Sequence, residues 1–352
     1  FGAVAGAWLL SQKRVRDGIA LSAAFAIVWV PPTIWRISYY GDFFPNTYYA
    51  KSASIPWWSQ GARYALWYLE RYMPFVLVPF ALVAAKARRR AALELAMVSV
   101  YALYVMRVGG DFMFARMFVP LTPFLALLLQ RALLLCGPRM WLFLTVASIA
   151  ALWLLPMPPH DNTHGVVDER HWYAVRPWAH DSDTEGAALE RTLHGLPVVV
   201  AFEGAGARRI YRSDVPTAIE CATGLTDAYI AHLPLHHRGR VGHEKHVPPE
   251  YLLARGVDFS TTPLIPRVEE VLPHLEIDLG GAPMLVLAWH PNIMNTVLAR
   301  GATFPHLTKQ LEKELERWRE QKPALVAREM DLFLRALQSL PSAGGDAPTR
   351  PR

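Results

Sequence analysis

Five apolar runs within the first 156 residues constrain the fold of this chain more than any other feature. The runs are 14–18 residues long, somewhat short of the roughly 20 apolar residues that a helix needs to cross a bilayer. Aromatic rings and arginines at their ends can supply the missing length. We therefore expect residues 1–156 to form an α-helical polytopic membrane domain of about five or six spans, rather than buried helices of a soluble protein. The runs are Gly18–Trp35, Tyr72–Ala85, Ala91–Met106, Met117–Gln130 and Met140–Leu155.

Three short basic loops set the expected orientation of these runs. They are "SQKRVRDG" at 11–18, "KARRRA" at 86–91 and "QRALLLCGPRM" at 130–140. Loops rich in Lys and Arg remain on the cytoplasmic side, so residues 36–71, 107–116 and everything after Pro156 should face outward. The same topology explains where the basic residues cluster in a chain of net charge +6. We therefore expect the lipid bilayer, and no nucleic acid, as a partner.

The second half of the chain has a different composition, because it holds most of the histidines, acidic residues and prolines. Short apolar runs predict buried strands at 197–202 and 282–290, and helices are expected at 184–194 and 307–340, the latter interrupted at Pro323. We expect residues 157–340 to form an extracytoplasmic mixed α/β domain and residues 341–352 to be a disordered tail. Because the chain begins at Phe1 inside an apolar run, we interpret the membrane domain as N-terminally truncated.

The segment "RISYYGDFFPNTYYAKS" at 36–52 is too polar for a core strand and too aromatic for an ordinary loop. Tyrosine rings suit the headgroup layer, where one end is apolar and the other wet. Pro31 and Pro32 should kink the preceding span, and Gly41 permits a sharp turn. With Tyr40 in that layer, Asp42, Asn46 and Lys51 would be polar groups held close to the bilayer surface; the alternative is a plain interfacial belt with a turn. The following residues, 54–73, predict an amphipathic helix in the membrane interface.

A second polar insert, "RVGGDFMFAR" at 107–116, is expected on the same side. Asp111 should project between Arg107 and Arg116, which would form either a structural salt bridge or an anion site that holds a phosphate. Glu94 is the one acidic residue inside the Ala91–Met106 run, and we expect it to pair with Arg90 near the cytoplasmic end. The two inserts together indicate a cavity for a lipid phosphate and a polar group.

Four short motifs in a fixed order then resemble one family. "YYGDFFPNTYYAK", "RVGGDFMFAR", "GLTDAYIA" at 224–231 and "GRVGHEK" at 239–245 resemble bacterial membrane glycosyltransferases of the GT-C class. More narrowly, they are similar to the group that contains the mycobacterial terminal β-1,2-arabinofuranosyltransferases. The resemblance covers most of Arg36–Phe259 and is weak after about residue 265.

This resemblance implies an enzyme of the bacterial inner membrane, multi-pass, with its C-terminal domain outside. It implies transfer of a sugar, arabinofuranose among the candidates, from a polyprenyl-phosphate donor to an envelope glycan or lipid acceptor. The main catalytic carboxylate of the class lies in the first outward loop, upstream of this chain. Asp42 and Asp111 are therefore supporting catalytic candidates, and the donor phosphate would contact Arg107, Arg116, Lys51, Tyr40 and Asn46.

The polar half supplies further candidate contacts. Asp168, Glu169 and Arg170 follow the last span and could line the same cavity, and His243 with Glu244 could form a general acid–base pair. Loop structure is the alternative for all of them. The expected contacts with the acceptor or its loop are Asp168, Glu169, Arg170, Asp227, His243, Glu244 and Lys245. No cofactor is required by the sequence, although His160, Asp161 and His164 have a spacing that could hold a divalent cation.

Two functions from different classes remain open at this point. In the first, the chain is a glycosyltransferase that uses a polyprenyl-phosphate-linked sugar. In the second, it is a non-catalytic, membrane-anchored envelope protein whose soluble domain binds glycan or a partner enzyme. A transporter would need more polar residues in the middle of the spans than these runs contain.

Overall fold

The computed structural model describes residues 1–154, 165–168, 178–203, 206–261 and 272–321. The chain divides into two compact units. The helical unit comprises Phe1–Val175 together with Leu235–Glu244, and the sheet unit comprises Arg176–Pro234 and Lys245–Arg352. The expected domain boundary at 156/157 lies outside the described residues. Assignment of Leu235–Glu244 to the helical unit was not expected from the sequence.

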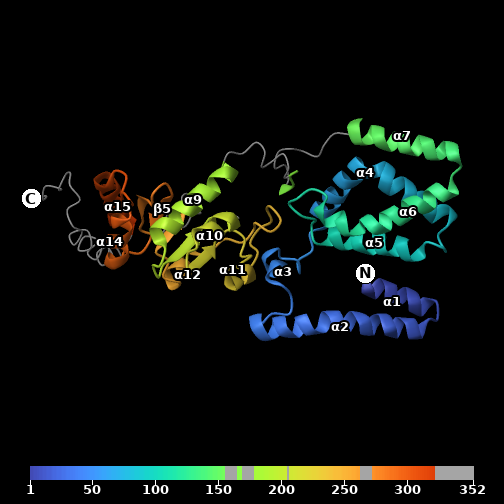
Figure 1. Ribbon diagram of the computed structural model, residues 1–352, viewed down its shortest axis with the longest axis horizontal. Helices are drawn as coiled ribbons and strands as arrows, with labels where there is room; N and C mark the ends of the chain where they lie inside the picture. The colour runs from blue at the N-terminus through green and yellow to red at the C-terminus, as the bar shows by residue number, and fades with distance from the viewer. Residues whose placement is uncertain (155–164, 169–177, 204–205, 262–271, 322–352) are drawn as a thin grey trace, which may run out of the picture. The chain divides into compact units, whose positions relative to one another are not determined.

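All five apolar runs form helices, drawn from blue to green in Figure 1. Helices α4, α5 and α6 pack together and bury a core that includes Tyr64, Val105 and Leu128. The helices of this unit are α1 (Gly2–Ser11), α2 (Val15–Tyr40), α3 (Asn46–Ala50), α4 (Trp58–Lys86), α5 (Ala92–Arg107), the 3-10 helix η1 (Arg116–Leu121), α6 (Thr122–Leu135) and α7 (Pro138–Leu154).

Among the described residues, two helical stretches are long and apolar enough to cross a membrane. These are Val15–Tyr40 and Arg116–Leu135, and the bent pair within α4 makes a third if it counts as one span. Only 11% of the apolar window of α2 is buried, and large side chains such as Val28 remain 75% exposed. Such an apolar surface is costly in water, so the helical unit is suited to a lipid bilayer. The larger span count stays a prediction.

Helix α4 contains the boundary that the sequence predicts between an interfacial helix and a span. Trp58–Met73 and Phe75–Lys86 meet at an angle of 87°, and Tyr72 has non-helical backbone angles at the bend. The two-helix prediction is therefore confirmed, whereas the interfacial position of the first part stays a prediction.

Helix α2 does not stop at its two prolines. It continues through Pro31 and Pro32 to Tyr40 and ends at Gly41, whose φ of 77° is left-handed. Apolar helices tolerate proline because unwinding the helix would expose backbone N–H and C=O groups where no water can hydrogen-bond to them. The predicted turn at Gly41 is confirmed, and the helix extends about one turn beyond the predicted span.

Glu94 has a different partner from the one expected. Its carboxylate accepts hydrogen bonds from Arg131 of α6 at 2.6 and 3.0 Å. Pairing with Arg90 fails because Arg90 lies in the turn before α5, whereas the packing of α5 on α6 brings Arg131 alongside. The side chain of Glu94 therefore ties α5 to α6.

The sheet unit is a mixed α/β fold, as expected, and its strands are drawn from yellow to orange in Figure 1. Its strand order is β2-β1-β3-β5-β4; β1 pairs in parallel with β2 and β3, while β5 is antiparallel to β3 and β4. The strands are β1 (Val199–Phe202), β2 (Thr217–Glu220), β3 (Phe259–Thr261), β4 (Leu275–Asp278) and β5 (Pro283–Val286). The helices are α9 (Trp178–Leu193), α10 (Ala207–Ser213), α11 (Ala228–His232), α12 (Pro249–Ala254), α14 (Pro291–Ala299) and α15 (Leu307–Gln321).

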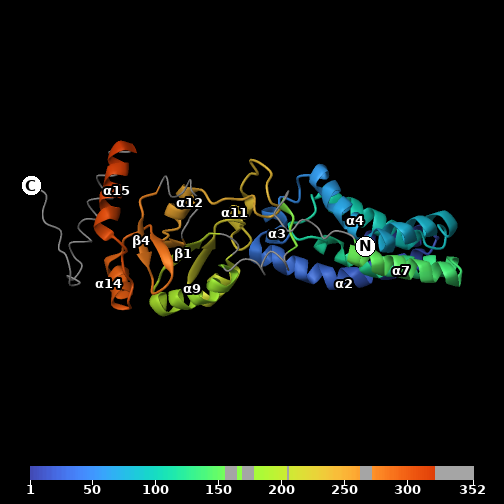
Figure 2. The same ribbon diagram turned by 90° about the horizontal axis from the view of Figure 1, so that it is seen from above.

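Strand β1 is buried on both faces, so it reads as a continuous apolar run, whereas the edge strand β4 alternates between buried and exposed side chains. In β1, Val200 and Phe202 pack into a core with α9 and α14, whereas Ala201 faces a second core with α11 and α12. This alternation follows the two-residue period of a strand. Figure 2 shows helices of the unit lying beside the sheet. The predicted strands at 197–202 and 282–290 and the helix at 184–194 are confirmed, and α15 confirms the first part of 307–340.

Candidate functional site

The candidate site forms on the loop between α5 and η1, where two glycines turn the chain inward. Gly109 and Gly110 have φ values of +88° and +73°, which L side chains rarely adopt. A Cβ on Gly109 would lie 3.1 Å from the Trp57 ring, and one on Gly110 would lie 2.8 Å from Cβ of Tyr64. The close approach that glycine permits carries the next residue, Asp111, into the interior.

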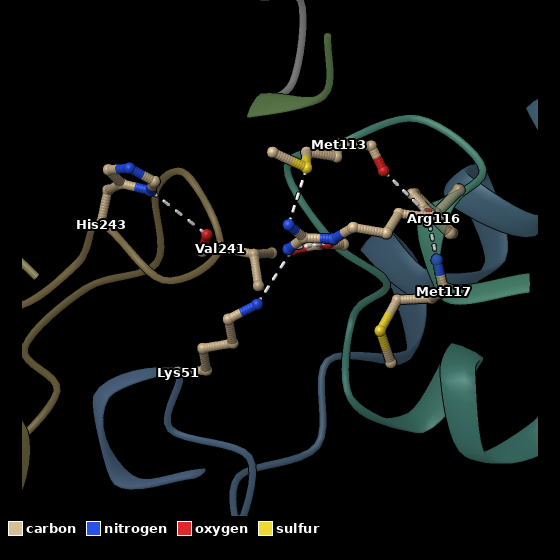
Figure 3. Close-up of polar contacts among 8 residues, drawn as sticks. Lys51, Met113, Arg116, Met117, Val241 and His243 are labelled. Carbon is tan, nitrogen blue, oxygen red and sulfur yellow. Dashed lines mark hydrogen bonds and ion pairs between the residues drawn. The ribbon is translucent and has the colours of Figure 1, made fainter. Parts of the chain in front are cut away.

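Asp111 is fully buried and is held by two cations. Lys51, the residue that follows α3, donates from Nζ to one carboxylate oxygen at 3.1 Å, and Arg116, the first residue of η1, pairs with the other. The side chains of Lys51 and Arg116 are 28% and 43% exposed. Figure 3 shows both cations approaching from separate segments, with Met113 Sδ accepting a bond from Arg116 at 2.7 Å. The two cations and one carboxylate carry a net charge of +1.

Three cationic side chains and one histidine ring lie around the ring of Phe112. The Lys51 nitrogen lies 5.7 Å from the ring centroid, and the guanidinium carbons of Arg116 and Arg240 lie at 5.0 and 4.6 Å. His243 contacts the same ring edge-on at 4.7 Å. Cations within about 6 Å of an aromatic centroid are attracted by its quadrupole. Lys51, Asp111, Phe112, Arg116, Arg240 and His243 are called the Asp111 cluster below.

The segment Leu235–Glu244 is anchored to the helical unit by Arg238. The Arg238 guanidinium stacks over Trp57 at 4.9 Å, donates to the carbonyl of Ile55 at 2.7 Å and pairs with Glu244 at 3.3 Å. Glu244 also accepts the N–H of Gly239 at 3.0 Å. These bonds fix the loop whose other residues, Arg240 and His243, reach Phe112.

Gly242 allows the same loop to approach Lys51. Its φ is +79°, and a Cβ there would lie 3.3 Å from Cγ of Lys51. A third segment also meets the cluster, because Val167 exchanges backbone hydrogen bonds with Phe112 and Phe114 at 2.8 and 3.0 Å. Asp168 follows Val167 and is 6% exposed.

Tyr64 of α4 fixes the loop of the Asp111 cluster through two hydrogen bonds. Its hydroxyl donates to the carbonyl of Met113 at 2.9 Å and accepts the N–H of Met117 at 3.2 Å, while its ring is fully buried. Both bonds join the Tyr64 hydroxyl to backbone groups, so Tyr64 fixes the path of the chain between Asp111 and Arg116. Nothing in the sequence indicates these two hydrogen bonds, since Tyr64 is one of several tyrosines in a helical pattern.

An apolar cavity of about 390 Å³ lies beside η1 in the helical unit. It is bounded by the bend of α4, by η1 and by α6, and Tyr72, Phe75 and Phe118 are among its walls. Ala115 also lines it and immediately precedes Arg116. The cavity therefore reaches the residue next to a cation of the Asp111 cluster.

The structure brings together Lys51, Asp111, Arg116 and His243 from the predicted set. Arg107 does not join them. Its guanidinium donates instead to the carbonyls of Ala53 and Ser54, both at 3.2 Å. The expected pairing of Arg107 with Asp111 is therefore wrong, because the two positive-φ glycines turn the chain between these residues.

The remaining predicted residues have other surroundings. Asp42 is half-buried in the loop between α2 and α3, Asn46 begins α3, and Tyr40 is 62% exposed at the end of α2. In the sheet unit, Asp227 caps α11 through Ile230 N–H at 3.0 Å, and Lys245 donates to the carbonyl of Leu233. Glu169 and Arg170 lie outside the described residues, as do His160, Asp161 and His164.

His243 and Glu244 do not bond to each other in the structure. Glu244 is bound by Arg238 and Gly239, whereas a ring nitrogen of His243 lies 3.4 Å from the carbonyl of Val241. Within the described ranges no group of three or more His, Cys, Asp or Glu side chains could hold a metal ion. The expected acid–base pair stays a prediction without a supporting contact.

The sequence does not single out Arg240 and Phe112 as members of the site. Both stand inside quoted motifs, "GRVGHEK" and "RVGGDFMFAR", but an apolar ring and one arginine among many carry no distinctive signal. The basic pair Arg238 and Arg240, spaced by a glycine, was the only available sign that this loop could face an anion.

We expect the stability of the protein to fall as the pH is lowered through the titration range of histidine. Burial, with help from Arg240 and Lys51, lowers the pKa of His243 to about 4. Between pH 6.5 and 4 the unfolded chain binds a proton at His243, whereas the folded chain does not. This difference lowers the free energy of unfolding by about 2 kcal/mol at pH 5. His243→Gln should remove this loss, so the drop in unfolding free energy from pH 7.5 to 5 should be smaller by about 2 kcal/mol. If denaturant melts show the same drop in unfolding free energy for the parent protein and for His243→Gln, the expectation is contradicted.

Comparisons of this chain with protein-family models, with curated proteins and with solved structures gave no match.

Proposed function

We propose that this protein is a membrane glycosyltransferase that moves a sugar, arabinofuranose among the candidates, from a polyprenyl-phosphate donor to an envelope glycan or lipid acceptor. The observation that carries the proposal is the Asp111 cluster. It presents two partly exposed cations, held in place by one buried carboxylate, on a unit of apolar helices. The resemblance of the motifs that supply these residues to GT-C enzymes supports the same reaction.

The cluster suits a phosphate for electrostatic reasons. Lys51 and Arg116 share one carboxylate, and their exposed parts can offer N–H donors to a bound anion. Hydrogen bonds between charged groups are about twice as strong as neutral ones, and arginine can bind phosphate through two parallel bonds. Asp111 orients the cations, because both its oxygens are engaged and none of its side chain is exposed.

The apolar cavity beside η1 supports a lipid-linked donor. A phosphate held at Arg116 would place the attached chain next to Ala115, where the cavity begins. Its walls of aromatic and aliphatic side chains suit a hydrocarbon and offer little to a nucleotide. A membrane-embedded donor also fits the exposed apolar surfaces of the surrounding helices.

The chemistry we propose is a single inverting displacement. The acceptor hydroxyl attacks the anomeric carbon, the bond from that carbon to the phosphate oxygen breaks, and the phosphate leaves with the electron pair. The hydroxyl proton passes to a carboxylate, for which Asp42 remains the candidate within this chain. Lys51 and Arg116 stabilise the charge that develops on the leaving phosphate.

The proposed location is the bacterial inner membrane, with the Asp111 cluster on the outer side. The rule that basic loops stay inside predicts that residues 36–71, 107–116 and 235–244 all face outward. Lys51, Asp111 and Arg240 come from these three segments and gather around Phe112, which supports a common side.

Replacing Arg116 by alanine should raise the KM for a polyprenyl-phosphate sugar by about 10–100-fold, the value of a charged hydrogen bond of 1.5–3 kcal/mol. The measurement is sugar transfer by the full-length protein in membranes with radiolabelled donor. Arg14→Ala is the matched control, because Arg14 pairs with Asp17 on an exposed turn of the same unit. Equal kinetics for both variants would remove the cluster from the reaction. A folded protein without donor turnover would favour the non-catalytic envelope protein.

A further inference from the structure

The turn that carries Lys51, residues 51–55, has a strained backbone. Ser52 has a φ of 48°, a left-handed conformation that residues other than glycine rarely adopt. Backbone hydrogen bonds close the turn, from Ser52 N–H to the carbonyl of Tyr49 at 2.9 Å and from Ile55 N–H to the carbonyl of Ser52 at 3.0 Å. A strained conformation of this kind persists only where the surrounding structure holds it. The position of Lys51 therefore depends on contacts from outside the turn.

Two arginines from distant parts of the sequence hold this turn by its carbonyl groups. Arg107, the last residue of α5, donates to the carbonyls of Ala53 and Ser54, each at 3.2 Å. Arg238 donates to the next carbonyl, that of Ile55, at 2.7 Å. A guanidinium group presents several N–H donors in a rigid plane, so one arginine can fix two acceptors at once. Three consecutive carbonyls of the turn are thus bound from outside it.

The side chain of Arg238 is itself held in place by a buried carboxylate. Glu244, whose side chain is fully buried, accepts from Arg238 at 3.3 Å and from the backbone N–H of the next residue, Gly239, at 3.0 Å. The Arg238 guanidinium also lies 4.9 Å from the centroid of Trp57. The Trp57 ring in turn packs against Gly109, where a Cβ would lie 3.1 Å from it. Arg238 therefore contacts the turn directly and, through Trp57, the loop that supplies the carboxylate of the site.

The segment that Arg238 anchors also contacts the stem of Lys51. A Cβ on Gly242 would lie 3.3 Å from Cγ and 3.4 Å from Cε of Lys51. The stem is therefore confined on this side, and its Nζ lies 3.1 Å from Oδ1 of Asp111. A long side chain loses rotamer freedom when it is confined, so a stem that is already ordered presents its ammonium group to a ligand at a lower entropic cost.

We propose that Arg107 and Arg238 are positioning residues, which act on the Asp111 cluster by holding the strained turn that carries Lys51. Neither arginine touches the donor. When either is lost, the turn relaxes and the Lys51 ammonium leaves the carboxylate of Asp111. The inference rests on the proposed function only for the task of the positioned group, which is to bind the donor phosphate.

The test is the rate at which acetic anhydride modifies Lys51 in the purified full-length protein in a neutral detergent, read by mass spectrometry. The variant combines Arg238→Met with Glu244→Gln, because a buried carboxylate left without its partner could prevent folding. Lys51 should be acetylated about tenfold faster than in the parent, the effect of one lost charged hydrogen bond. Lys309, exposed on α15, is the internal reference and should keep its rate. An unchanged rate at Lys51 in the folded variant would overturn the proposal.

A second variant reaches the same turn from the other side. Among the described residues Arg107 forms no ion pair, so Arg107→Met leaves no carboxylate unpaired, and it should also raise the Lys51 rate about tenfold. Arg300→Met is the matched control, because Arg300 donates to the carbonyls of Thr192 and His194 in the sheet unit, at 3.0 and 2.8 Å. A parent rate at Lys51 in Arg107→Met, or an equal rise in Arg300→Met, would overturn the proposal.

Donor kinetics separate positioning from a general structural role. The pair Arg238→Met and Glu244→Gln should raise the donor KM about tenfold. In a Lys51→Ala background the same pair should change KM by less than about twofold, because residues that act through one group are not additive. An equal factor in both backgrounds would show that the arginine acts independently of Lys51, which contradicts the proposal.

Failure of this inference is distinguishable from failure of the proposed function, since the labelling of Lys51 needs no sugar transfer. Faster labelling of Lys51 in the variants of a protein that transfers no sugar would leave the positioning role standing and remove the enzyme. Sugar transfer by the parent protein, with unchanged labelling of Lys51 in the variants, would leave the glycosyltransferase standing and remove the role of the two arginines.

Discussion

Replacing Asp111 by asparagine is expected to lower the kcat of sugar transfer by about 100-fold or more, as loss of a preorganised electrostatic group does in other enzymes. The KM for the donor should stay unchanged or fall. The Lys51, Asp111 and Arg116 trio would change from +1 to +2, so an anion would still be attracted. The two cations would lose the carboxylate that orients them. They would then no longer be positioned to stabilise the charge on the leaving phosphate.

This split between kcat and KM separates a positioning role from misfolding. A misfolded protein loses active molecules, which a donor-binding titration on the detergent-purified variant would reveal as fewer sites. Asp17→Asn is the control, since Asp17 forms an exposed pair with Arg14 in the same unit. A variant of Asp111 with full kcat would show that the buried carboxylate serves only the fold.

Replacing Gly61 by alanine is expected to destabilise the helical unit by about 3 kcal/mol or to prevent its folding, at the upper end of overpacking effects. Gly61 of α4 packs against the backbone of Met106 at the end of α5. A Cβ would overlap the Met106 carbonyl oxygen and lie 2.5 Å from its Cα. Backbone atoms cannot rotate away as a side chain can, so the two helices would have to separate.

Thermal melting of the purified protein measures this effect, and Gly6→Ala provides the control. Gly6 lies within helix α1, and a Cβ there meets no atom within 4 Å. Because alanine favours a helix more than glycine does, the control should melt at or slightly above the parent temperature. A Gly61→Ala protein that melts with the parent would contradict the close crossing of α4 and α5.

The helices and strands were largely predictable because each depends on a local pattern. Apolar runs fixed α2, α5 and α6, and the two-sided burial of β1 made "PVVVAF" a continuous apolar stretch. The apolar run Gly18–Trp35 already predicted that α2 continues through Pro31 and Pro32, although helix propensity measured in water disfavours proline at these positions. In an apolar environment the cost of unravelling outweighs the lost hydrogen bonds.

The candidate site was predictable only in part, because its contacts join distant segments. Lys51 and Asp111 are separated by 60 residues, and nothing local in either motif specifies their pairing. The loop Leu235–Glu244 lies even further along the chain, and its composition resembles an ordinary polar turn. In the structure Asp111 stands out because its side chain is buried. In the sequence Arg107 is an equally good candidate for the ion-pair partner of Asp111, but it binds elsewhere.

The most direct test of the proposed glycosyltransferase function is transfer from a panel of radiolabelled polyprenyl-phosphate sugars, arabinofuranose included. The panel is assayed in membranes from cells with and without the full-length protein. We predict protein-dependent transfer from one donor, lost in Asp111→Asn and retained in Asp17→Asn. Absence of transfer from every donor, with the protein present and folded in the membrane, would contradict the glycosyltransferase and favour a binding protein of the envelope.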